Sequence, residues 1–203
     1  MTQFILFALL IILPLGGLTT EQAASQHQAH HSSMPSWPGM SELEQLLNAQ
    51  FELLNGENET VTEQDFRGQY LLLSFGFSHC KHVCPTTLQN WALMMKKLPD
   101  AKAARLQPIM ITLDPERDSP AHIDQYSKLF NPTFLGLSGS LEQIAKTAEN
   151  FRVSYHKVAV GDDYQINHSS LSFLIDPNGQ VIDYFGFGTP SQQLAEKIAV
   201  RIP

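Results

Sequence analysis

Apolar residues occur in short runs separated by turn residues, with two kinds of spacing along the chain. Continuous apolar runs at 70–77 and 106–113 predict strands buried on both faces. Apolar side chains at helical intervals, including Leu88 and Trp91, predict a helix from Pro85 to about Leu98. The same reasoning predicts a helix at about 120–130, a strand at 133–137, and helices at about 140–150 and 191–201.

Turn residues predict how the remaining strands pair. Residues 151–160 and 164–166 are expected to pair across Gly161-Asp162-Asp163, and 171–175 with 181–185 around Asp176-Pro177-Asn178-Gly179. An edge strand is expected at 51–54, followed by an Asn55-Gly56 turn. Alternating strands and helices that end in a hairpin and a helix predict an α/β sandwich with a central mixed sheet. This order of elements is that of a thioredoxin-like domain.

The leading segment differs from the rest of the chain. Phe4–Leu18 is apolar, and its 15 residues would form about 22 Å of helix, less than the roughly 30 Å core of a bilayer. This length predicts an export signal or a short membrane anchor within residues 1–25. Polar residues 26–40, with His27, His30 and His31, read as a flexible linker, followed by one domain at 41–203 that opens with a helix capped by Ser41. The protein is therefore expected on the periplasmic side of the inner membrane, either soluble after cleavage or associated with the membrane through its N-terminus.

Charge limits the classes of partner. The 203 residues carry a net charge of −7, and no Lys or Arg precedes Arg67. The 13 basic residues form no cluster, which argues against nucleic acid as a ligand.

The only two cysteines, Cys80 and Cys84, follow the strand at 70–77 and come just before the helix at Pro85. Open α/β sheets expose chemistry at this end of their strands, and a helix N-terminus lowers a thiol pKa. If both lay on one helical turn, their Cβ atoms would be about 5–6 Å apart, wider than a disulfide prefers and easily bridged by a metal. A soft metal site and a redox dithiol both remain open. A purely structural disulfide is a weaker alternative, because so small a loop gives little entropic stabilisation.

His168 precedes the strand at 171–175, which the topology places beside the cysteine strand. Two thiolates and one imidazole suit Cu(I) as a three-coordinate site, and Cu(II) with one further ligand. Zinc would need a fourth donor that the sequence does not supply. A histidine without a metal-binding role, on the surface or in the core, is the alternative.

Three separated motifs carry a family resemblance. They are Phe75-Gly76-Phe77-Ser78-His79-Cys80-x-x-Val83-Cys84-Pro85, then Asp114-Pro115-Glu116-Arg117-Asp118-Ser119-Pro120, and then Asn167-His168-Ser169 before Phe173-Leu174-Ile175-Asp176-Pro177. Over roughly residues 50–200 the chain resembles the Sco (SenC) family of copper chaperones. The resemblance implies a thioredoxin-like protein that binds copper through Cys80, Cys84 and His168. It implies delivery of copper to the binuclear site of cytochrome c oxidase subunit II, or reduction of that site's thiols. Another extracytoplasmic copper protein and other copper chaperones are further expected partners.

The chain departs from the family pattern at Lys81-His82, where the family usually has Pro-Asp. His82 is thus an additional candidate ligand. Asp114 ends the strand next to the cysteine strand, and it is either a supporting residue of the site or part of a local turn with Arg117 and Asp118. The main alternative to a chaperone is a thiol–disulfide oxidoreductase that acts on target cysteines. A peroxidase is less supported, because the sequence has no Thr/Ser-x-x-Cys site with a matching arginine.

Overall fold

The computed structural model describes residues 47–203. The expected export signal or anchor at 1–25, the linker at 26–40 and the helix at Ser41 lie outside the described residues. Within 47–203, no helix is both long enough and apolar enough to cross a membrane.

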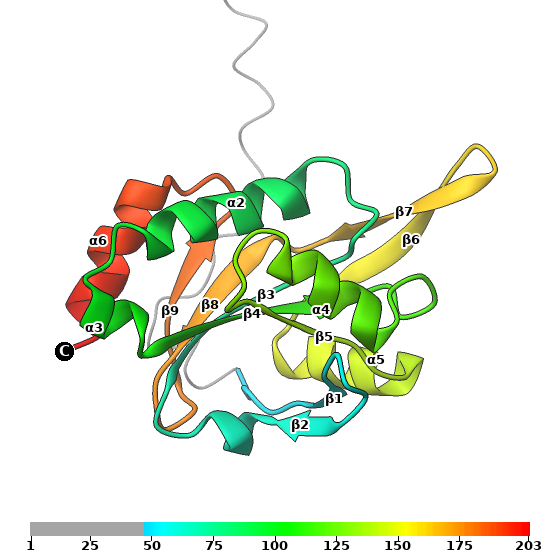
Figure 1. Cartoon of the computed structure of the whole chain (residues 1–203). Coiled ribbons are helices and arrows are strands. Elements are labelled where there is room, and N and C mark those ends of the chain that lie inside the picture. The colour runs from blue at the N-terminus through cyan, green and yellow to red at the C-terminus, as the bar shows by residue number, and fades with distance from the viewer. Residues whose placement is uncertain (1–46) are drawn as a thin grey trace, which may run out of the picture. The chain divides into compact units, whose positions relative to one another are not determined.

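A five-stranded mixed sheet forms the centre of the domain (Figure 1). Its strand order is β5-β4-β3-β8-β9, in which β3, β4 and β5 are parallel, β8 is antiparallel to β3, and β9 is antiparallel to β8. The strands span Tyr70–Gly76 (β3), Leu106–Thr112 (β4), Leu135–Leu137 (β5), Leu171–Ile175 (β8) and Val181–Gly186 (β9). The mixed sheet expected from the sequence is confirmed, and β8 lies beside the cysteine strand as predicted.

Strand β3 is buried at every position, which explains its continuous apolar run. Because side chains alternate along a strand, neighbouring residues of β3 face opposite helices. Gly76 faces Cys84 of α2 (Val83–Met95), whereas the ring of Phe75 packs against Phe151, just after α5 (Leu141–Asn150). The helices α2 and α5 therefore cover opposite faces of the sheet. The other α-helices within 47–203 are α3 (Asp100–Ala103), α4 (Pro120–Lys128) and α6 (Ser191–Arg201).

The main helix boundary differs from the prediction. Helix α2 begins at Val83 and ends at Met95, so Pro85 is its third residue rather than its first. Proline is tolerated there because the N–H groups of a first helical turn have no partner within the helix. The helix stops before Lys96-Lys97-Leu98-Pro99, since the residue before a proline disfavours helical geometry.

Residues 151–154 extend the end of α5 instead of starting a strand. Phe151 caps α5, and Arg152 adopts a positive φ of 54°. The next strand, β6, therefore spans Tyr155–Val160. Close to the end of α5, β1 (Glu52–Leu54) pairs with β2 (Thr60–Thr62), followed by the short 3-10 helix η1 (Glu63–Phe66).

Strand β6 pairs with β7 (Asp163–His168) in a hairpin that is a separate two-stranded sheet. The hairpin extends beyond the edge of the domain (Figure 1, yellow). His168, the last residue of β7, is paired in register with Tyr155.

Candidate metal centre

The two cysteines lie in different environments at the end of β3. Cys80 is in the loop and half-buried, while Cys84 is in the first turn of α2 and buried, and both are free thiols. A Cβ on Gly76 would lie 2.6 Å from the sulfur of Cys84, so this glycine makes room for the buried thiol. Since α2 begins only at Val83, Cys80 lies before the helix, and the spacing argument for two cysteines on one helical turn does not apply.

The surroundings of Cys80 favour the thiolate form of its side chain. The Cys84 thiol donates to its sulfur, and this lowers the pKa of Cys80 to about 5, helped by the backbone N–H groups of Cys84, His82 and Val83 and opposed by burial. The Cys84 N–H lies 3.5 Å from Cys80 Sγ, in a helical turn that no side-chain oxygen caps. The pKa of Cys84 is raised, because its proton is held in the bond to Cys80 and because the group is buried. At neutral pH the pair therefore carries one negative charge, on the more exposed sulfur.

A buried carboxylate anchors the loop that carries Cys80. Asp118 is inaccessible to solvent and accepts hydrogen bonds from the Ser78 N–H at 2.9 Å, the Ser78 hydroxyl at 2.5 Å and the Thr112 hydroxyl at 2.7 Å. The local turn considered from the sequence is present, since the Asp118 N–H donates to the Asp114 carbonyl at 2.8 Å, but the role of the Asp118 side chain was not predicted. Its partners lie on β3's loop and on β4, so it ties the cysteine loop to the neighbouring strand.

His168 presents one ring nitrogen for a metal. Its Nδ1 lies 2.9 Å from the carbonyl oxygen of Ser169. A carbonyl only accepts, so Nδ1 carries a proton, and Nε2 is the ring nitrogen that a metal would use, as in many metal-binding histidines. The ring packs edge-on against Phe77, at 6.2 Å between centroids.

Cys80 and His168 line the same cavity, of about 520 Å³. The Cys80 loop contributes one wall, with His82 and Val83, and the hairpin contributes the facing wall up to His168. Cys84 does not line the cavity, because its side chain is turned toward Gly76. Among residues 47–203, no three His, Cys, Asp or Glu side chains are already arranged to hold a metal ion.

Asp114 is buried and bound on both of its carboxylate oxygens. It accepts from the Arg117 Nε at 2.5 Å and from the Tyr164 hydroxyl at 2.7 Å. The local pairing of Asp114 with Arg117 agrees with the turn interpretation. Its bond to Tyr164 of the hairpin was not foreseen, because nothing in the sequence pattern links these residues.

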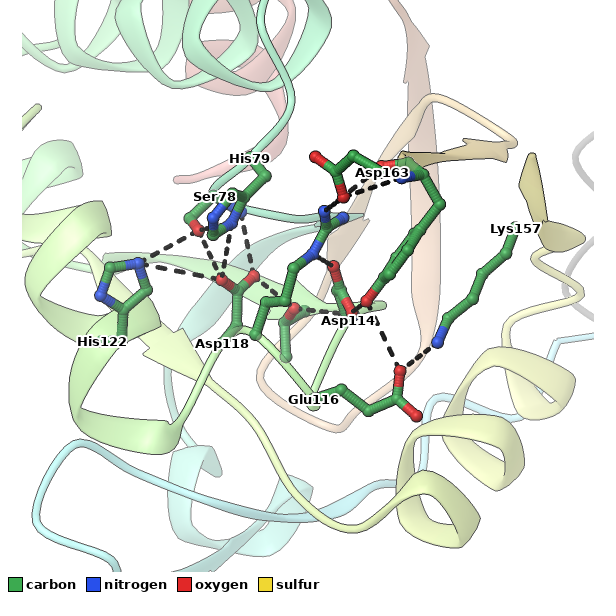
Figure 2. A network of polar contacts seen from close by, with 11 residues as sticks. Ser78, His79, Asp114, Glu116, Asp118, His122, Lys157 and Asp163 are labelled. Carbon is green, nitrogen blue, oxygen red and sulfur yellow. Dashed lines mark hydrogen bonds and ion pairs between the residues drawn. The ribbon is translucent and has the colours of Figure 1, made fainter. Parts of the chain in front are cut away.

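Two histidines lie beside the centre rather than in it. Rings of His79 and His122 each approach the Ser78 hydroxyl, at 3.0 and 3.1 Å, and both lie 3.9 Å from Asp118 (Figure 2). His79 does not line the cavity, although it is adjacent to Cys80 in sequence. The position of His122 on α4 carried no sequence signal, since only the fold brings α4 to the cysteine loop.

Fold and site together define a thioredoxin-like α/β domain with a Cys-x-x-x-Cys dithiol at the N-terminus of a helix and a histidine-bearing hairpin facing it. The family model described as SCO1/SenC matches residues 40–202. The chain belongs to the SCO1/SenC family.

Individual relatives agree with this assignment. The mitochondrial SCO2 homolog of Mus musculus is 38% identical over 157 residues, which are 75% of this chain and 61% of that protein. The chain thus matches about three-fifths of the length of that relative. The structure of Arabidopsis thaliana ScoI with copper bound aligns with a TM-score of 0.71 at 31% identity, covering 75% of this chain and 96% of that one. The structure of yeast Sco1 with copper bound aligns with a TM-score of 0.70 at 33% identity, covering 77% of this chain and 88% of that one.

Proposed function

We propose that this protein binds copper as cargo through Cys80, Cys84 and His168 and passes it to an extracytoplasmic copper protein. The observation that carries the proposal is the shared cavity, which is lined by both the low-pKa thiol of Cys80 and by His168, whose Nδ1 is already engaged with the Ser169 carbonyl. Two sulfurs and an imidazole are donors that copper prefers. Relatives of similar sequence have been solved with copper bound.

Copper binding requires the centre to close. The thiol of Cys84 loses its proton to solvent to become a ligand, and the imidazole of His168 and the two sulfurs come together around the metal. His82 lines the same cavity and remains the additional candidate ligand. Release follows by exchange: a thiolate of the target forms a bond to copper as one protein ligand leaves, so the oxidation state of the metal does not change.

The expected acceptor is the binuclear copper site of cytochrome c oxidase subunit II. This expectation comes from the family resemblance, whereas the expected location on the periplasmic side of the inner membrane comes from the apolar leading segment. The test of the acceptor is direct transfer: the copper-loaded protein is mixed with the reduced copper domain of subunit II, and copper is measured on each protein after separation. Copper that stays on the donor at equilibrium would reject this acceptor.

The copper site itself is tested by titration of the reduced 203-residue chain with Cu(I) against a competing chelator. Cys80→Ala and Cys84→Ala are expected to abolish competitive binding, and His168→Ala to weaken it strongly. His156→Ala is the matched control, since His156 is exposed on β6 and does not line the cavity. X-ray absorption of the complex should count two sulfurs and one nitrogen, and a second nitrogen would indicate His82. Failure of the wild-type protein to compete for Cu(I) would overturn the proposal.

The unequal cysteines also favour a second function, thiol–disulfide exchange with target proteins. An accessible thiolate with a buried neighbouring thiol is the arrangement of a nucleophile and its resolving group. Cys80 would attack a target disulfide and expel one target thiolate. Cys84 would then attack Cys80 and release the second, leaving a Cys80–Cys84 disulfide. This reaction does not need His168, so full activity of His168→Ala in target reduction, together with unaltered function in cells, would favour it over copper delivery.

A further inference from the structure

The hairpin that carries His168 depends on side chains for its orientation. Among the described strands, β6 and β7 pair only with each other and not with the five-stranded sheet. An isolated two-stranded hairpin is marginally stable in water. Alternation along β7 places Tyr164, Ile166 and His168 on the same face, and Ile166 is buried against the domain. Contacts made by this face therefore set where His168 lies.

Tyr164 makes the strongest polar contact of that face. Its hydroxyl donates to the buried carboxylate of Asp114 at 2.7 Å, and the Arg117 guanidinium lies over its ring, 3.7 Å from the centroid. Arg117 in turn donates to Asp114 at 2.5 Å. We call Asp114, Arg117 and Tyr164 the hairpin clamp. Hydrogen bonds to a buried charge and cation–π contacts are among the stronger side-chain interactions.

Charged residues surround the clamp at the surface. Arg117 also pairs with Asp163 at 2.9 Å, and Lys157 of β6 pairs with Glu116 (Figure 2). These pairs are partly or largely exposed, so each contributes little by itself. The bond from Tyr164 to the buried carboxylate of Asp114 is therefore the contact to test.

Two residues of the clamp, Asp114 and Arg117, lie in the loop after β4, and this loop also anchors the separate loop that carries Cys80. Asp114 and Arg117 bind the hairpin, while Asp118, four residues after Asp114, binds Ser78 in the cysteine loop (Figure 2). One short loop after β4 thus contacts both walls of the cavity. This common loop therefore helps to fix the position of the hairpin relative to the thiols.

We propose that Tyr164 is a positioning residue for copper capture, which acts by holding His168 in reach of Cys80 and Cys84. This inference rests on the proposed function. Tyr164 and His168 are four residues apart on one strand, about 13 Å at the rise of a β-strand, so Tyr164 does not act as a ligand. Fixing the far part of the strand limits the orientations of the hairpin before the metal arrives. Limiting them reduces the ordering that His168 must undergo on binding.

The test is a double-mutant cycle that combines Tyr164→Phe with His168→Ala. Tyr164→Phe removes the hydroxyl and keeps the ring beneath Arg117. It is expected to weaken Cu(I) binding about tenfold in the wild-type background, the lower end of effects seen for groups that orient metal ligands. In the His168→Ala background it should have no effect, because the residue it positions is gone. X-ray absorption of the copper-loaded Tyr164→Phe protein should show a reduced imidazole contribution.

Tyr155→Phe is the matched control. Tyr155 lies in the same hairpin, opposite His168, and its hydroxyl makes no hydrogen bond within residues 47–203. Its removal should leave Cu(I) affinity within about twofold. A second measurement needs no copper: hydrogen exchange of the β7 amides should be faster in Tyr164→Phe than in Tyr155→Phe.

The outcomes separate this inference from the function on which it rests. Equal weakening by Tyr164→Phe in both backgrounds, or no weakening in the wild type, overturns the positioning role while copper binding stands. Unchanged β7 exchange in Tyr164→Phe also overturns it. If His168→Ala binds Cu(I) as tightly as wild type, the proposed ligand set fails and the inference fails with it.

Discussion

The cysteine loop and the β6–β7 hairpin form facing walls of one cavity, but they are attached to the domain differently. The loop joins the fully buried strand β3 to helix α2, and its Ser78 is bound to the buried carboxylate of Asp118. The hairpin shares no ladder with the five-stranded sheet among the described strands, and it is held by Ile166 and the clamp. Cys84 is thus part of the structural core and Cys80 is anchored to it, whereas the hairpin that carries the histidine is held by a few side chains that can be exchanged one at a time.

This contrast implies two levels of stability. Changes around the cysteine loop should alter the free energy of unfolding of the whole domain. Changes in the hairpin should mostly alter its local opening, since such segments open at a lower free energy than the core. Metal capture would then combine a rigid dithiol with an adjustable imidazole.

The largest effect is expected from Leu73→Ala in β3. Leu73 is fully buried at the centre of the sheet, so its truncation should lower the free energy of unfolding by about 2–5 kcal/mol. Chemical denaturation of the copper-free protein measures this. Val158→Ala on the exposed side of β6 should change the free energy of unfolding by less than about 0.5 kcal/mol. Comparable losses for the two variants would contradict the division into core and attached hairpin.

Asp118→Ala should have the next largest effect. It leaves the Ser78 N–H and the Ser78 and Thr112 hydroxyls without their acceptor, which should cost on the order of 2–3 kcal/mol of stability. Asp163→Ala is the paired change on the hairpin. Its carboxylate is largely exposed, so the expected loss is about 0–1 kcal/mol. Both values come from denaturation curves, and a smaller loss for Asp118→Ala than for Asp163→Ala would mean that the anchor of the cysteine loop has been misassigned.

Ile166→Ala should act locally. Ile166 is the buried residue of β7, and its truncation removes the apolar contact that holds the middle of the hairpin. We expect the β7 amides to exchange about tenfold faster, a change of about 1.4 kcal/mol in local opening, with exchange in β3 unchanged. Hydrogen exchange read by NMR separates the two strands. Faster exchange in β3 as well would show that the hairpin unfolds with the core.

The sequence pattern predicted the parts of the molecule that depend on local spacing. Apolar runs identified β3 and β4, and turn residues identified the pairing of β6 with β7 and of β8 with β9. The start of α2 was misplaced because Pro85 favours a first helical position locally. In the structure the sulfur of Cys80 accepts the Cys84 N–H, and the helix begins two residues earlier.

The supporting contacts of the site were not predictable in the same way. Asp118 binds Ser78 across 40 residues, and Asp114 binds Tyr164 across 50. Periodicity indicates which face of a strand is buried, but it does not identify the polar partner that meets a residue across two loops. The roles of Cys80, Cys84 and His168 as ligands remain predictions, because they came from residue type and family resemblance.

The smallest expected effect is no change at all. It concerns the pKa of Cys80 in the copper-free protein, and it tests whether the hairpin wall of the cavity influences the thiolate on the opposite wall before copper binds. The pKa of Cys80 is lowered to about 5, mainly by the Cys84 thiol and by nearby N–H groups of α2, so its causes lie on the cysteine side. Alkylation needs the thiolate, so its rate in the copper-free protein should be half-maximal near pH 5, level off at higher pH and fall at lower pH. Cys84, whose pKa is raised, should stay unmodified over this range.

His168→Ala should leave the midpoint of this alkylation profile unchanged, because the imidazole contributes none of the interactions that lower the pKa of Cys80. Mass spectrometry of quenched samples assigns the modified cysteine at each pH. Lys81→Ala is a suitable control for general charge, as Lys81 is exposed beside Cys80. A midpoint that rises by a unit or more in His168→Ala alone would show that the histidine already acts on the thiolate without the metal. The hairpin would then be part of the preformed centre, and the contrast between a fixed dithiol and an adjustable imidazole would not hold.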